Sequence, residues 1–191
     1  MNAETDKLSP QQSLDLISEM INQAKGNVRD NSFYFLLWGW AIALAHLAVF
    51  ILANVKYQYP YIVWFVIVPL TWVITLARVY RQSKQARVVT HLDKIYSSLW
   101  IGYGIFAACI SFAFGRYINY QIDAVLLMAG GICMLTTGFI IRFNPIMLGS
   151  LALFIGGCTC FFLDPITQNF VGAVTIALGY LMPGYLLRAK R

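Results

Sequence analysis

Six uncharged apolar runs constrain the fold of this 191-residue sequence more than any other feature. Each run crosses, or nearly crosses, the hydrocarbon core of a bilayer, which takes about 20 helical residues. Because a lipid-exposed segment must satisfy its own backbone hydrogen bonds, each run is predicted to be helical. Short connectors pair the runs into three hairpins. The sequence therefore predicts an all-α integral membrane six-helix bundle with spans at roughly 33–53, 61–79, 98–117, 124–141, 145–163 and 170–187.

The charges that flank these runs predict the orientation of the chain. If the N-terminus is inside, the outer segments hold only Lys56 and Arg116, and all other basic residues lie inside. Such an excess of Lys and Arg is typical of cytoplasmic segments. We therefore expect a bacterial inner (cytoplasmic) membrane protein with both termini in the cytoplasm. The inner basic residues are Lys7, Lys25, Arg29, Arg78, Arg81, Lys84, Arg87, Lys94, Arg142, Arg188, Lys190 and Arg191.

The polar segment 1–31 precedes the membrane domain 32–191 and is predicted to be a cytoplasmic amphipathic helix. Ser9, Pro10 and Gln12 form a helix start with a capping box. Five apolar residues, spaced alternately by three and four, then share one helix face. This interaction stripe rests on lipid headgroups or on the protein's own loops; the alternative is a docking surface for a cytoplasmic partner or for a second copy of the chain. Its members are Leu14, Ile17, Ile21, Ala24 and Val28.

The longest inner loop, predicted for residues 78–96, is basic. It holds one acid, Asp93, and a short amphipathic helix is expected to lead from it into the third span. Such a loop contacts anionic lipid headgroups, and docking of an acidic partner is the alternative. Nucleic-acid binding is excluded, because no recognition module is present. The basic loop residues are Arg78, Arg81, Lys84, Arg87 and Lys94.

Three polar or helix-perturbing residues lie deep in the first two spans: His46, Pro69 and Trp72. Proline cannot donate a backbone hydrogen bond, so Pro69 frees a carbonyl four residues earlier. We predict that His46 donates to a carbonyl near Pro69 and pins the first hairpin; ligand or haem binding is the alternative. Asp123 and Asp164 are expected at the outer ends of helices, where water reaches them.

No catalytic chemistry is predicted from the sequence. No hydrolase, metalloprotease or phosphate-loop motif is present, and no nucleophile has an evident base. The middles of the spans hold no charged residue, which disfavours ion-coupled transport. The four cysteines lie in apolar runs and are expected to pack as small residues, although Cys158 and Cys160 leave a metal or redox pair as the alternative. No cofactor and no metal are predicted.

Small residues stand where helices could approach closely. Gly149 and Gly156, like Gly172 and Gly179, are seven positions apart in the last two spans. Such spacing favours close packing between helices in a membrane. The bundle is expected to pack on itself, and a homodimer face is the alternative. Similar Gly–Arg pairs in the three hairpins leave an internal repeat open.

Several stretches of the chain, in their order and spacing, resemble a family of uncharacterised small six-span inner-membrane proteins of Bacteroidota. The resembling residues are 16–25, Leu37-Trp38-Gly39, 100–105, Thr137-Gly138, Arg142-Phe143-Asn144-Pro145, Gly149 and 183–187. The resemblance implies an inner-membrane location and six spans, with no assigned activity. Members are often encoded beside a small winged-helix regulator, which implies a sensing or regulatory role.

The function expected from the sequence is non-enzymatic. We predict an interaction or regulatory role at the cytoplasmic face, with the lipid bilayer and a cytoplasmic protein as partners. The alternative is a small permease for an uncharged or amphiphilic solute. An enzyme would require a pocket that holds His46 and a second reactive group. The permease would be lined by aromatic residues and by Thr71, Thr75, Thr136 and Thr137.

Overall fold

The computed structural model describes residues 10–84 and 91–189, apart from the side chains of residues 10, 12–31, 83 and 91–93. Within these ranges the chain is helical and contains no strand, which confirms the all-α prediction. Two π-helical segments continue or join helices. The elements are α1 (Pro10–Asn54), α2 (Ile62–Ser83), α3 (His91–Cys109), η1 (Ile110–Phe114), α4 (Ile122–Ile141), α5 (Asn144–Cys160), α6 (Pro165–Ile176), η2 (Ala177–Leu181) and α7 (Met182–Ala189).

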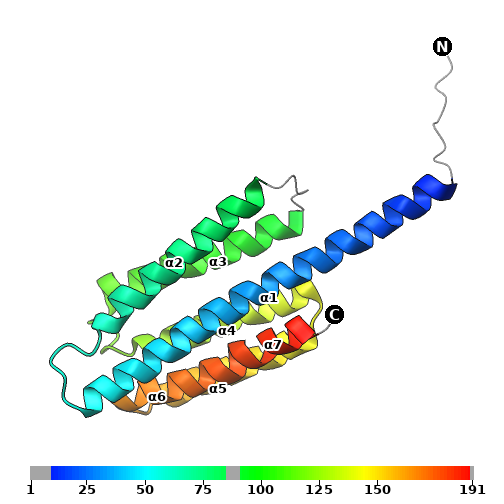
Figure 1. Ribbon diagram of the computed structural model, residues 1–191. Coiled ribbons are helices and arrows are strands. Elements are labelled where there is room, and N and C mark those ends of the chain that lie inside the picture. Colours follow the sequence, from blue (N-terminus) through cyan, green and yellow to red (C-terminus); the bar gives the residue numbers. More distant parts are fainter. Residues whose placement is uncertain (1–9, 85–90, 190–191) are drawn as a thin grey trace.

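The helices run alternately in opposite directions along one bundle axis, as Figure 1 shows. This arrangement gives the bundle two ends. At the end that we call proximal, α1 extends beyond the bundle, and α4 turns into α5 (Figure 1). At the opposite end, which we call distal, the connections 55–61, 115–121 and 161–164 lie together. Residues far apart in the sequence therefore meet at each end.

Five helical segments are long and apolar enough to cross a membrane. The fifth predicted span corresponds to α5, which has 17 residues and is shorter than the others. The structure therefore supports a membrane protein with several apolar helices. The five longer segments are Ser32–Asn54, Ile62–Gln82, Lys94–Phe114, Ile122–Ile141 and Pro165–Ala189.

The closest antiparallel pair is α4 with α5, which the three-hairpin prediction assigned to two different hairpins. The turn between them is tight, because Arg142 ends α4 in the left-handed conformation (φ 55°). On the other side of α5, Gly149 faces Gly179 of η2. A methyl group at Gly149 would lie 2.5 Å from the carbonyl oxygen of Gly179. The absence of side chains at both positions allows this approach, and the predicted self-packing of glycines is confirmed there.

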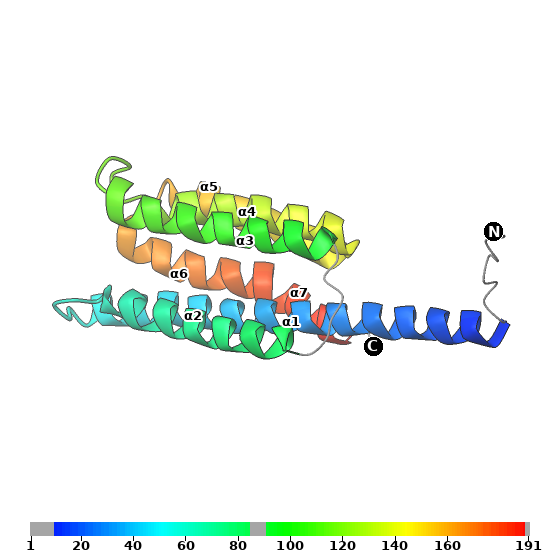
Figure 2. The same cartoon turned by 90° about the horizontal axis from the view of Figure 1, so that it is seen from above.

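Helices α2 and α3 lie at the periphery of the bundle. Only 6% of the residues in the span window of α2, and none in that of α3, are buried, against 44% in α4. Helix α2 packs on α1, and α3 packs on α4. Figure 2 separates the two helices, although they overlap in Figure 1. Side chains bridge them: the Trp72 ring lies against Gly104, and the Phe65 and Phe112 rings are 6.1 Å apart.

Helix α1 is a single unbroken helix of 45 residues. The sequence predicted an amphipathic segment followed by a separate span, with a change of character near Asp30. In the structure the two parts form one continuous rod, whose first part extends away from the other helices (Figure 1). The residues of the interaction stripe are therefore joined rigidly to the span that follows them.

Candidate functional site

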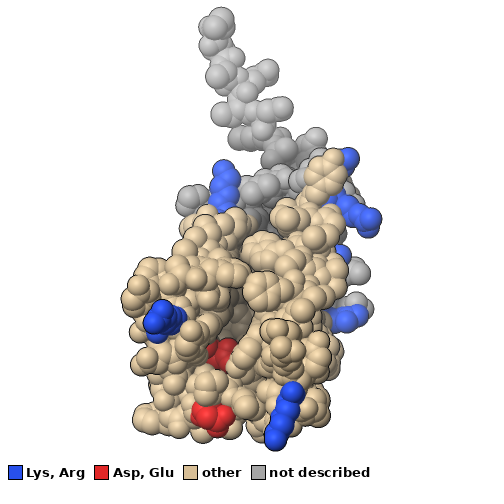
Figure 3. Space-filling view, turned by 90° about the vertical axis from the view of Figure 1, so that its left-hand side faces the viewer, with Lys and Arg blue, Asp and Glu red and all other residues tan. Residues whose placement is uncertain are grey.

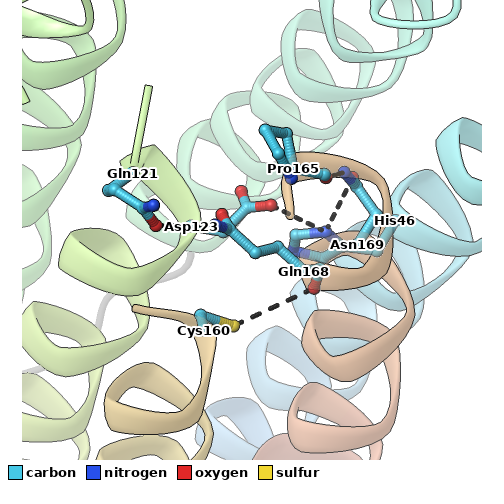
Figure 4. Close-up of polar contacts among 7 residues, drawn as sticks. All are labelled: His46, Gln121, Asp123, Cys160, Pro165, Gln168 and Asn169. Carbon is cyan, nitrogen blue, oxygen red and sulfur yellow. Dashed lines mark hydrogen bonds and ion pairs between the residues drawn. The ribbon is translucent and has the colours of Figure 1, made fainter. Parts of the chain in front are cut away.

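A cluster of polar side chains converges at the distal end from three helices that are separated in sequence. We call it the distal polar cluster; it consists of His46 on α1, Gln121 and Asp123 at the start of α4, and Gln168 and Asn169 on α6 (Figure 4). His46, Gln168 and Asn169 are at most 4% exposed. Buried polar groups of this kind require partners, because an unsatisfied group costs free energy.

The hydrogen bonds of Asn169 define the protonation of the histidine ring. Asn169 Nδ2 donates to the carbonyl oxygen of Pro165 at 2.8 Å, so its Oδ1 faces His46. His46 Nδ1 lies 3.3 Å from that oxygen. Since an amide oxygen only accepts, His46 Nδ1 carries the hydrogen and donates it. The ring packs closely on Gly172: a methyl group there would lie 2.8 Å from Cε1, between the two ring nitrogens.

Gln168 joins the starts of α4 and α6. Its Nε2 donates to Gln121 Oε1 at 2.6 Å and to the carbonyl oxygen of Leu163 at 2.9 Å. Both hydrogens of the amide nitrogen are therefore in use. Below it, Cys160 Sγ lies 4.0 Å from the carbonyl oxygen of Gln168. This network holds the distal connections in place around the cluster (Figure 4).

Asp123 lies at the distal end of α4, as predicted, but it is largely buried beside His46. Its side chain is 19% exposed, and Oδ2 lies 4.0 Å from His46 Nδ1. No described residue donates a hydrogen bond to the carboxylate. Asp123 stands in the first turn of α4 and is held beside the buried His46.

Asp164, by contrast, is exposed as predicted. It caps α6 by accepting from the backbone N–H groups of Ile166 and Thr167, each at 3.0 Å. The Thr167 hydroxyl also donates to Asp164 Oδ1 at 2.6 Å. These hydrogen bonds, that from the Thr167 side chain first, lower the pKa of Asp164 below its ordinary value. The role of Asp164 is thus to begin the helix that carries Gln168 and Asn169.

His46 is buried as predicted, but its predicted partner was wrong. Its hydrogen bond goes to Asn169 of α6 rather than to a carbonyl near Pro69. Helix α2 continues through Pro69, which is exposed. The link of His46 to the second helix is instead a ring contact with Trp64, with the ring centroids 4.8 Å apart. Trp72, the third of the predicted structural residues, packs edge-on against Trp38.

Trp64 and Tyr61, at the start of α2, border the distal polar cluster. Trp64 is partly buried, and its ring turns inward to His46. Tyr61 is half exposed. Partial burial raises the pKa of the Tyr61 hydroxyl, and the negative charges of Asp123 and Asp164 raise it further.

The predicted basic loop is largely helical. Arg78 and Arg81 lie in α2, and Lys94 lies in α3. Arg78 packs over the Phe33 ring of α1, with its guanidinium carbon 4.0 Å from the ring centre, whereas Arg81 and Lys94 are exposed. Lys84 ends α2 and lies 4.5 Å from the Tyr80 ring centre. Arg87 lies outside the described residues.

The remaining predicted sites are not brought together in the described structure. The backbone of the interaction stripe lies in α1, and its side chains are outside the description. Cys158 is exposed and Cys160 is buried, so the two point to different surroundings. Among the described residues no three His, Cys, Asp or Glu side chains converge as metal ligands would. Of the proposed permease lining, Thr71 and Thr137 are buried, and Thr75 and Thr136 are partly exposed.

The distal end is hollowed between the helices. Figure 3 shows a recess at the centre of this face, with acidic atoms on its wall and basic atoms towards the edge. Only two acids have described side chains, Asp123 and Asp164, and both lie at this end. Lys56 and Arg116 are exposed in the distal connections. The centre of the face is therefore negative, and its rim is positive.

Sequence reasoning found His46 but missed the residues that surround it. Gln168 and Asn169 were treated as part of a connector that precedes the sixth span. A usable signal was present, because Asp164-Pro165-x-Thr167 begins a helix at this point and puts both amides in its first turns. Two adjacent amides in an apolar helix predict buried hydrogen bonds. The spacing of residues along the sequence does not tell which side chain these two amides contact.

No family model, curated protein or solved structure matches the chain.

Proposed function

We propose that this protein is a non-enzymatic integral membrane protein with an interaction or regulatory role at the cytoplasmic face. The observation that carries the proposal is the continuity of α1. One rigid helix holds the buried His46, the apolar segment Ser32–Asn54 and the interaction stripe. A change at the distal end would therefore move the stripe as part of the same body.

The proposed topology is six spans with both termini in the cytoplasm. Five helices have the length to cross, and α5, with 17 residues, is at the lower limit for a span. The helical segments alternate in direction (Figure 1), as a serpentine chain requires. The asymmetry of Lys and Arg supports a cytoplasmic proximal end and hence a location in the inner membrane of a bacterium.

The geometry of α1 favours a protein contact for the interaction stripe over lipid. Residues 10–31 continue the span along its own axis for about 33 Å, at about 1.5 Å per residue. A helix that leaves the membrane in this way cannot also lie flat on the headgroups. The apolar face of its far end therefore needs a protein partner, either another protein or a second copy of this chain.

The surroundings of His46 support a non-enzymatic role. A general base needs a free ring nitrogen within hydrogen-bond reach of a nucleophile or substrate. In this structure Nδ1 donates to Asn169, the ring packs closely on Gly172 and Trp64, and no nucleophilic side chain of the described residues hydrogen-bonds to it. The resemblance to inner-membrane proteins encoded beside a regulator points the same way by association only.

The experiment that tests this proposal is crosslinking in native membranes followed by mass spectrometry. We expect the full chain to crosslink to a cytoplasmic protein or to itself through residues 10–31. The double variant Ile17→Ser, Ile21→Ser removes the centre of the stripe and should lose those crosslinks. The matched control, Gln12→Ser with Gln23→Ser, changes the opposite face of the same helix and should keep them.

Insertion must be measured in parallel. Both variants should remain in the membrane fraction, because neither change touches the apolar segment Ser32–Asn54. If the stripe variant yields the same crosslinked species as the control, the cytoplasmic contact surface is not the stripe and the proposal fails.

The second candidate function is a permease for a small uncharged or amphiphilic solute. The recess of the distal end in Figure 3 is the observation that favours it. Purified protein in vesicles would then accelerate the swelling caused by such a solute. The variant Gly172→Leu, which fills the space beside His46, would abolish this acceleration.

A further inference from the structure

One carboxylate in the distal recess lacks a matched partner. Asp123 Oδ2 lies 4.0 Å from His46 Nδ1, an ion-pair distance if the histidine is protonated but beyond hydrogen-bond distance. That N–H already donates to Asn169 Oδ1. An ionised carboxylate has about four sites that accept hydrogen bonds. Asp123 therefore retains the capacity to bind a donor that carries positive charge.

Two of the three amide donors in the distal polar cluster are committed elsewhere, which disfavours an anion in the same recess. Asn169 Nδ2 donates to Pro165, and Gln168 Nε2 donates to Gln121 and Leu163. An anion would need free N–H groups or a basic side chain near its own charge. The described basic residues of this end lie in the exposed connections, away from the acidic centre of the face (Figure 3).

Aromatic residues stand near the same carboxylate. The Trp64 ring contacts His46, whose Nδ1 is 4.0 Å from Asp123, and Tyr61 precedes Trp64 at the start of α2. A cation near the face of such a ring is attracted by the ring quadrupole. The rings also offer apolar surface to an alkyl group. A carboxylate beside aromatic rings is chemically suited to an organic cation rather than to a bare inorganic ion, which prefers a cage of several oxygen ligands.

We infer that the distal recess binds a small primary ammonium ion from the distal side of the membrane. The ammonium N–H groups donate to Asp123, and the alkyl part lies against Trp64 and Tyr61. His46 and Asn169 hold the helices α1 and α6 at the spacing that keeps the recess open. This inference does not rest on the proposed function, because the bound ion serves equally as a signal to α1 or as a transported solute.

The test is calorimetric titration of the full chain in lipid nanodiscs. The probes are primary alkylammonium chlorides from methylammonium to butylammonium, each paired with the alcohol of the same chain length, and sodium chloride. We expect saturable binding of the ammonium ions and none of the alcohols or of sodium. Bound ligand should also raise the melting temperature of the protein.

The decisive variant is Asp123→Asn, which keeps the shape of the side chain and removes its charge. We expect ammonium affinity to fall by about 30-fold or more, as for other buried charge partners. The matched control is Asp164→Asn, which removes a charge from the exposed acid of the same face and should change the affinity by less than about threefold.

Three outcomes would overturn the inference: no ammonium binding by the unaltered protein, equal binding of the alcohols or of sodium, or full affinity in Asp123→Asn. If Asp123→Asn does not fold, Trp64→Leu provides a second test. Loss of this ring should weaken ammonium binding by about 2- to 30-fold. Unchanged affinity in Trp64→Leu would remove the aromatic contact from the inference.

Discussion

Helices α2 and α4 have nearly the same mean hydropathy but very different surroundings. Helix α4 is buried along much of its length against α5, whereas α2, like α3, exposes most of its apolar side chains. The two environments divide the molecule into a packed group, α1 with α4 to α7, and a peripheral pair, α2 and α3. Hydropathy identifies all of these helices as membrane segments but does not separate the two classes.

Glycine content separates them. Helix α4 has three glycines, each facing a neighbouring side chain: Gly130 meets Tyr103, Gly131 meets Phe154, and Gly138 meets Met147. Helix α2 has none, and in α3 a methyl group at Gly102 would meet nothing within 4 Å, whereas one at Gly104 would meet only the Trp72 ring of α2, the other member of the peripheral pair. Because lipid chains are as apolar as leucine, burial alone does not bring helices together in a membrane. Close backbone approach does so, and glycine permits it.

The largest expected effect comes from filling a glycine contact in the packed group. In Gly149→Leu the new side chain begins 2.5 Å from the carbonyl oxygen of Gly179 and 3.1 Å from Pro183 Cγ. Backbone atoms cannot move aside as a flexible side chain can. We expect a loss of about 3 kcal/mol in the free energy of unfolding, measured by titration from mild detergent into a denaturing one.

The matched substitution in the peripheral pair is Gly102→Leu on α3. Its new side chain enters open space, so stability should change by less than about 0.5 kcal/mol. A loss in Gly102→Leu as large as that in Gly149→Leu would break the comparison. It would mean that α3 is covered by another protein surface, such as a second copy of the chain.

The next effect concerns buried hydrogen bonds. Asn169→Leu preserves volume but leaves His46 Nδ1 and the carbonyl of Pro165 without their partner. Leaving a buried polar group unsatisfied costs about 1–3 kcal/mol, and we expect a loss in this range in the same unfolding titration. Full stability in Asn169→Leu would show that water replaces the amide and that the cluster is wet.

A polar contact of the peripheral pair should matter less. Thr75 on α2 accepts a hydrogen bond from Trp38 Nε1 at 3.2 Å, in a partly exposed position. In Thr75→Val this bond is lost, and we expect a decrease of about 0.6 kcal/mol, typical of hydrogen bonds between membrane helices. If Thr75→Val lost more stability than Asn169→Leu, the strongest polar contact of α1 would be with α2 instead of α6.

The sequence predicted the helices well because hydropathy and helix length are local properties. Their boundaries agree within a few residues for most spans, and the burial of His46 was also predictable. Contacts between helices could not be predicted from the sequence. The partner of His46 depends on how α1 is rotated against α6, and the pairing of α4 with α5 depends on which glycine faces meet. Both follow from three-dimensional packing that a linear pattern does not contain.

Asp123 shows the limit most clearly. Its position at the first turn of an apolar helix predicted a hydrated carboxylate, as Asp164 has. The two acids differ in their surroundings: Asp123 is 19% exposed beside buried His46, whereas Asp164 is exposed and caps α6. The side chain of Asp123 therefore faces His46. The sequence gives the position of a residue along its helix. The direction in which its side chain points depends on how the neighbouring helices pack, which the sequence pattern does not give.

The smallest effect is expected at an exposed contact within the packed group. Asp164 caps α6, and its hydrogen bonds lower its pKa below the ordinary 3.8. A depressed pKa in the folded state means that the stabilisation is present above the ordinary value and is lost as the pH falls through the folded value. The melting temperature of Asp164→Ala should therefore lie below that of the unaltered protein at about pH 6 and approach it at about pH 3.

Asp164→Asn separates the cap from the charge. Asparagine caps helices about as well as aspartate does, so this variant should keep most of the stability at both pH values. If the melting temperature of Asp164→Ala lay below that of the unaltered protein by the same amount from about pH 6 to about pH 3, the carboxylate would contribute through its shape alone and not through its charge. A small, pH-dependent deficit would mean that even in the packed group a solvent-exposed contact contributes little. Burial against neighbouring helices, rather than membership of the group, would then determine what a contact contributes to stability.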